Sequence, residues 1–124
     1  MYMKENDFIT GQIQELLFEI GIPANLMGFT YIVAALQIAL LNREYIYRMT
    51  KLLYAEVAKQ YGVSPASVER CIKYAITVGW TCGSAECIEQ IFKHSINPAR
   101  GVPTNSQFIT HLHLYFTTQQ TNEK

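Results

Sequence analysis

The segment YAEVAKQYGVSPASVERCIKY, residues 54–74, constrains the fold of this chain more than any other part of it. Gly62 separates two helix-forming stretches, and a residue without a Cβ can adopt the left-handed backbone that ends a helix and turns the chain. Ser64 is a good N-cap, and Pro65 suits the first position of a helix because its missing N–H loses no hydrogen bond there. The segment therefore predicts a helix-turn-helix, with a first helix over 54–61 and a second that begins at Pro65.

The second helix of this motif is predicted to have one apolar face and one polar face. Its apolar residues recur at three- and four-residue spacing and are Val68, Cys71, Ile72 and Ala75. Its outward, polar residues are Ser67, Glu69, Arg70, Lys73 and Tyr74. A second helix of this kind lies in the major groove of DNA and reads base edges. The pattern predicts a DNA-binding module in which Lys59 and Ser64 are further contacts; an αα-hairpin with a tight glycine turn is the alternative.

The rest of the chain is predicted to be a helical scaffold for this motif. Hydrophobic periodicity indicates an all-α fold of about six helices around the helix-turn-helix, without a wing, and Val63 is expected to fill the gap between the two helices of the motif. No alternating strand pattern is present. The expected helices outside the motif cover residues 8–20, 29–41, 43–49, 85–93 and about 105–117. The second helix of the motif should continue to Trp80, which we expect to be largely buried.

Length and composition indicate one domain, residues 1–124. At 124 residues and 49% hydrophobic composition, the chain can build a single sizeable core. The longest apolar run, residues 29–41, is shorter than the ~20 residues that span a bilayer. The first residues, MYMKENDF, lack a basic region followed by a hydrophobic stretch, so no signal peptide is expected and the cytoplasm is the expected compartment.

The net charge is zero, but the charges are unevenly distributed. Residues 43–73 contain six cations against three anions, whereas residues 1–20 contain one cation against four anions. Positive potential is thus concentrated on the segment that is predicted to meet DNA. A monomer with so little net charge should bind DNA loosely, which favours tandem or dimeric binding.

The sequence contains no pattern that indicates an enzyme, a metal site or a bound cofactor. A glycine-rich phosphate loop, paired carboxylates on one face, and a nucleophile with a recognisable base are all missing from it. His111 and His113 would lie about 200° apart on a helix, so we expect one to face solvent and the other to pack. The three cysteines, an odd number without ligand spacing, are expected to be reduced core thiols.

Four segments of the chain together resemble a known family: GIPANLMGFTYI (21–32), LLYAEVAKQYGVSPASVERCIKYAI (52–76), the Trp80 and Gly83 landmarks, and PTNSQFI (103–109). The sequence resembles the DNA-binding effector domain of the master response regulator that initiates sporulation in endospore-forming Firmicutes, over residues 9 to about 112. The resemblance implies an all-helical fold and binding to a short promoter box, often by a tandem pair of domains. It also implies regulation of transcription through contact with a sigma subunit of RNA polymerase.

The resemblance places the family's base-reading Glu and Arg on Glu69 and Arg70. Arg can bond guanine through two acceptors, and Glu can accept a hydrogen bond from cytosine. The family has Arg at the position of Ser67, and Arg and His at those of Lys73 and Tyr74. The second helix of the motif therefore offers fewer cationic side chains to DNA than its counterpart in the family. A protein-interaction module that keeps the fold with weak or lost DNA binding is the alternative function.

The resemblance also implies an activating surface on the helix after the recognition helix. The corresponding residues here are Gly83, Cys87, Glu89, Phe92 and Ile96. Family members usually carry an N-terminal receiver domain as well, and this chain begins a few residues before the effector match. It is either an excerpt of a longer regulator or a stand-alone protein without phosphoryl control, and the native-looking start favours the second.

Overall fold

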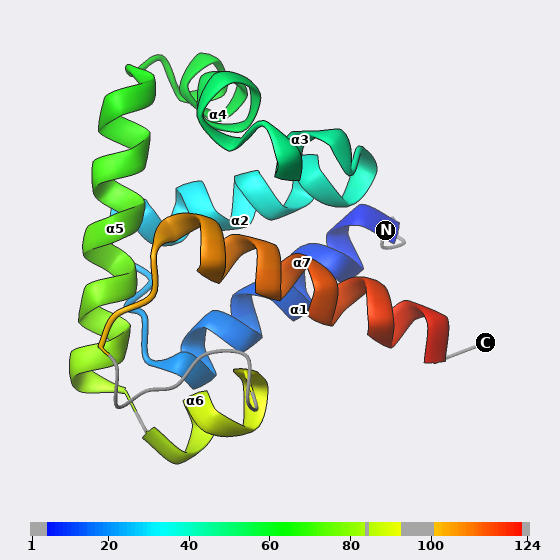
Figure 1. Cartoon of the computed structure of the whole chain (residues 1–124), viewed down its shortest axis with the longest axis vertical. Coiled ribbons are helices and arrows are strands. Elements are labelled where there is room, and N and C mark those ends of the chain that lie inside the picture. The colour runs from blue at the N-terminus through cyan, green and yellow to red at the C-terminus, as the bar shows by residue number, and fades with distance from the viewer. Residues whose placement is uncertain (1–4, 84, 93–100, 123–124) are drawn as a thin grey trace.

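Helix α2, Met27–Leu41, forms the middle of the fold, and most of the other helices pack against it (Figure 1). The structure is a computed structural model that describes residues 5–83, 85–92 and 101–122. Within these residues the fold is all-α, as predicted, with seven α-helices rather than about six. The other elements are α1 Glu5–Ile20, α3 Glu44–Tyr47, the π-helical turn η1 Met49–Leu53, α4 Tyr54–Tyr61, α5 Pro65–Cys82, α6 Ala85–Phe92 and α7 Asn105–Asn122. No helix in these ranges is long and apolar enough to cross a membrane.

Helix α2 is central because its sequence is apolar on nearly every side. Nine of its fifteen residues are buried, and it packs against α1, α5 and α7 as well as against the short helices that follow it. A helix that is hydrophobic all round is stable only inside a protein, which is why the other helices collect around this one. Its predicted position is confirmed, although it begins at Met27 rather than at residue 29.

Helix α5 is held at its middle and at its far end. Gly28 of α2 lies against the backbone of Cys71, so the two helices cross with no side chain between them. At the last turn, the ring of Trp80 lies 5.3 Å from that of Phe92 and 5.8 Å from that of Phe108. Trp80 is partly buried in this cluster, and its Nε1 is buried without a hydrogen-bond partner among the described residues. These contacts leave the first half of α5 to face solvent on one side.

The segment between α2 and α4 differs from the prediction. The sequence predicts one short helix over 43–49, whereas α3 ends at Tyr47 and Arg48 leaves helical geometry, with φ −127° and ψ 55°. The π-helical turn η1 follows, and the N–H of Leu52 donates to the Arg48 carbonyl over 2.8 Å. Met49 and Leu53 are both buried, and the wider turn allows both side chains to reach the core.

Helix α7 begins with a reciprocal cap. The Thr104 N–H donates to Oε1 of Gln107 over 2.9 Å, and the Gln107 N–H donates to Oγ1 of Thr104 over 3.1 Å. This capping box satisfies two backbone donors at the helix start. Thr104 is thus the N-cap of α7, and the helix continues to Asn122, beyond the predicted end near residue 117.

Candidate nucleic-acid interface

The turn of the helix-turn-helix has the predicted geometry. Gly62 ends α4 in the left-handed conformation, with φ 67° and ψ 36°. Ser64 caps α5 because its Oγ accepts a hydrogen bond from the Ser67 N–H over 3.1 Å, and Pro65 occupies the first helical position. Val63 is an exception, since its side chain is 36% exposed and does not fill the gap between the helices. The boundaries of α4 and the start of α5 are thus confirmed.

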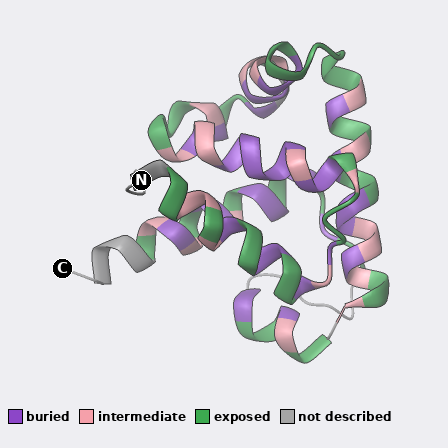
Figure 2. Cartoon of the chain, turned by 180° about the vertical axis from the view of Figure 1, so that it is seen from behind, coloured by how far each residue is buried: buried purple, intermediate pink, exposed green. Residues whose placement is uncertain are grey.

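Helix α5 presents the predicted polar face to solvent. Val68, Ile72 and Ala75 are buried against the core, and Cys71 is half-buried. Exposed and buried residues alternate along this helix (Figure 2). The predicted contact residues that are exposed are Lys59, Ser64, Glu69, Arg70, Lys73 and Tyr74, whereas Ser67 is half-buried. The face thus has a cationic centre formed by two adjacent turns of α5.

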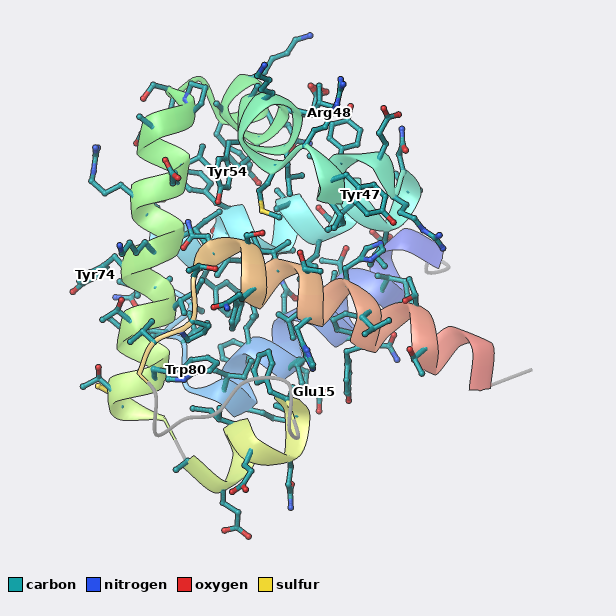
Figure 3. The ribbon with its side chains drawn as sticks, viewed as in Figure 1. Glu15, Tyr47, Arg48, Tyr54, Tyr74 and Trp80 are labelled. Atoms are coloured by element: carbon teal, nitrogen blue, oxygen red, sulfur yellow. The ribbon has the colours of Figure 1, made fainter. Side chains whose placement is uncertain are left out.

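An open groove of about 820 Å³ runs beside this face. Its α5 wall consists of Ala66, Glu69, Arg70, Lys73 and Thr77. Its opposite wall consists of Tyr47, Arg48, Met49 and Lys51, from α3 and η1. Tyr54 and residues 102–106, which lead into α7, complete the lining. Figure 3 shows Tyr47 and Arg48 across the groove from α5.

The groove brings together only part of the predicted site. Glu69, Arg70 and Lys73 line it, whereas Tyr74 points away from the molecule on the outer side of α5 (Figure 3). Arg48 and Lys51 were not among the residues predicted to contact DNA. The signal was present, because both residues belong to the positively charged segment 43–73, but nothing in the sequence places η1 opposite α5.

Asn105 joins three helices at the base of the groove. Its side chain is 9% exposed, and its Nδ2 donates to the carbonyl oxygen of Glu69 over 2.9 Å. Asn105 also hydrogen bonds with the hydroxyl of Tyr54. Burial raises the pKa of Tyr54, the Asn105 hydrogen bond partly offsets this rise, and the charge of Glu69 adds to it. Tyr54 therefore stays a neutral phenol and ties α4 to the start of α7.

The proposed activating surface on α6 is only partly accessible. Glu89 is exposed, and Gly83 and Cys87 are half-buried. Burial and the nearby Glu19 raise the pKa of the Cys87 thiol. The assignment of Phe92 is wrong, since its side chain is 0% exposed and is enclosed by aromatic rings. Ile96 lies outside the described residues.

The two histidines of α7 both pack. Nε2 of His113 lies 3.1 Å from the carbonyl oxygen of Ala39, and the His111 ring lies 4.8 Å from that of Phe92. The expected difference between them is only partial, since His113 is buried and His111 is half-buried. Within the described part of the chain, no group of three or more His, Cys, Asp or Glu side chains could hold a metal ion. The sequence predicts that all three cysteines lie in the core, but Cys82 is exposed.

Together, the fold and the groove define an all-α protein built around a helix-turn-helix, with cations on the α5 wall of the groove and on the wall opposite. A family model described as sporulation initiation factor Spo0A C terminal matches residues 13–116. The chain belongs to this family, which comprises DNA-binding effector domains of a sporulation response regulator and is not a family of enzymes. The match runs from α1 into α7 and includes the whole helix-turn-helix.

Proposed function

We propose that this chain binds double-stranded DNA at a specific sequence through α5 and thereby regulates transcription. The observation that carries the proposal is the groove itself, in which the exposed Arg70 and Lys73 of α5 stand opposite two further cations. An exposed helix with a polar face fits a DNA major groove, and cations on the two walls of the protein groove complement the phosphates that border it.

The residues of α5 have different roles in this proposal. The guanidinium of Arg70 donates two hydrogen bonds to one guanine, and Glu69 accepts one from a cytosine. Ser67, Lys73 and Tyr74 extend the contact along the helix, and Lys59 and Ser64 bind phosphates. This last group fixes the position of α5 on the duplex without reading sequence.

Selection from randomised duplexes, followed by titration at several salt concentrations, tests the proposed function. A sequence-specific binder enriches one box, prefers it to a scrambled duplex by a large factor, and loses affinity steeply as salt increases. A protein-interaction module that has kept the fold enriches nothing and has a shallow salt dependence. That result would refute DNA binding and favour the alternative function.

Two features of regulation are part of the proposal. Two copies bind neighbouring half-sites about one helical turn apart, because a single neutral copy binds weakly. A single box that binds as tightly as a tandem pair, at equal protein concentration, would rule this out. The exposed side of α6 around Glu89 contacts a sigma subunit of RNA polymerase; Glu89→Ala should then preserve DNA binding and reduce transcription from the selected box.

A further inference from the structure

We infer that the wall of the groove opposite α5 binds the phosphate backbone of one DNA strand through Arg48 and Lys51. This inference rests on the proposed DNA binding and extends it to a second element, η1, that is separate from the recognition helix. Arg48 and Lys51 are both exposed, and both line the groove.

The backbone of η1 holds the two cations in place. Met49 is 8% exposed and Leu53 is 0% exposed, so these two side chains anchor the π-helical turn to the core. Arg48, just before the turn, and Lys51, within it, are exposed. The N–H groups of Leu52 and Leu53 both donate to the Arg48 carbonyl, which closes the turn next to the point where the chain leaves α3. Arg48 and Lys51 therefore extend from a fixed base, although their own side chains are free to adjust.

The charge of this wall matches a polyanion. The α5 wall combines two cations with the carboxylate of Glu69, but the residues on the η1 wall include no acid. Residues 102–106, on the third side, carry no charge. A base edge requires mixed donors and acceptors, as on α5, whereas a phosphate requires only donors and positive charge. The η1 wall offers the positive charge and the donors of Arg48 and Lys51, together with the Tyr47 hydroxyl, and no carboxylate, which suits a phosphate.

The place of η1 in the chain agrees with a backbone contact. It leads directly into α4, the first helix of the motif, and the first helix of a helix-turn-helix crosses the DNA backbone. A strand that passes over α4 while α5 occupies the major groove would have its phosphates in front of η1. Arg48 and Lys51 would then neutralise about two phosphates, and each phosphate contributes about 0.9 to the salt-dependence slope.

The test is a set of salt titrations of Arg48→Ala, Lys51→Ala and the double variant, each on the selected duplex and on a scrambled duplex. We expect each single variant to reduce the slope of log affinity against log salt by about one, and the double variant by about two. Both duplexes should lose affinity by the same factor. Arg48→Lys, which keeps the charge, should keep the slope. Thermal melts of every variant show that it is folded at the titration temperature.

Arg43→Ala is the matched control, because Arg43 is an exposed cation just before α3 that does not line the groove. For Arg43→Ala, the slope of log affinity against log salt should equal that of the wild type. If Arg48→Ala and Lys51→Ala behave like Arg43→Ala while the wild type binds DNA, the η1 contact is wrong and the proposed function stands. A loss of affinity confined to the selected duplex would also overturn the η1 phosphate contact, since it would indicate base reading. If the wild type binds no duplex at low salt, the proposed function itself fails.

Discussion

Gly28 of α2 and Cys71 of α5 are in backbone contact: a Cβ built on Gly28 would overlap the carbonyl oxygen of Cys71. The same Cβ would lie 2.6 Å from that of Ala75. Helix α5 thus packs directly against α2 at Gly28, where a larger side chain would clash with the backbone of Cys71. A side chain at position 28 would push α5 away from α2, and the groove beside α5 would change its shape with it.

Gly28→Ala should therefore destabilise the protein. Overpacking of a well-packed contact costs roughly 1–3 kcal/mol, and a clash with backbone is at the upper end because backbone cannot rotate away. Gly11→Ala is the control, because Gly11 lies in α1 with nothing within 4 Å of its Cβ position. That substitution should be neutral or stabilising by about 0.5–1 kcal/mol. Denaturant unfolding of both variants measures the difference, and equal stabilities would contradict the close crossing.

Asn105→Ala should weaken both the fold and the site. It removes the donor to the Glu69 carbonyl and a partner of the buried Tyr54 hydroxyl, and an unsatisfied buried polar group costs roughly 1–3 kcal/mol. Ser106→Ala, next to it on the groove and exposed, should leave the free energy of unfolding nearly unchanged. Urea titrations of the two variants provide the comparison. A loss no larger than that of Ser106→Ala would mean that water replaces these hydrogen bonds.

Arg70→Ala should reduce binding to the selected duplex by roughly 1–3 kcal/mol and flatten the preference at one base pair. The reason is that a guanidinium donates two hydrogen bonds to one guanine, which a shortened side chain cannot replace. Lys59→Ala should weaken binding to all duplexes alike. Paired titrations on selected and scrambled duplexes at one salt concentration check both expectations. Equal losses for Arg70→Ala on the two duplexes would make Arg70 a phosphate contact.

Stability should decrease as the pH falls from about 7.5 to 5.5. Burial lowers the pKa of His111 and His113 from the ordinary value of 6.5, so the unfolded chain binds protons more readily than the folded one. The stabilisation is fully present above the unfolded-state pKa and is lost as the pH falls through the folded-state values. Thermal melts across this window should show the loss, and His113→Gln should reduce it. A pH-independent midpoint would show that both imidazoles titrate normally in the folded state.

Local signals explain why the motif could be predicted and why one segment next to it, residues 48–53, could not. Gly62, Ser64 and Pro65 act on their own backbone, so the end of α4 and the start of α5 follow from those residues alone. The turn η1 depends instead on where Met49 and Leu53 find the core, which is a tertiary property. Phe92 was placed on the activating surface by the family resemblance alone, which did not reveal the aromatic cluster around its side chain.

The separation of charge between α1 and the groove has a consequence for how the protein meets DNA. Glu15 of α1 and Arg48, which precedes η1, lie well apart in Figure 3, and the chain has no net charge. A neutral protein with separated charges has an electric dipole. The field of a DNA duplex therefore rotates the protein more than it attracts it at long range, and the groove turns toward the phosphates. Neutral copies also do not repel one another over long distances. The proposed tandem binding therefore meets no long-range repulsion between net charges, whatever the shorter-range interaction of the two dipoles.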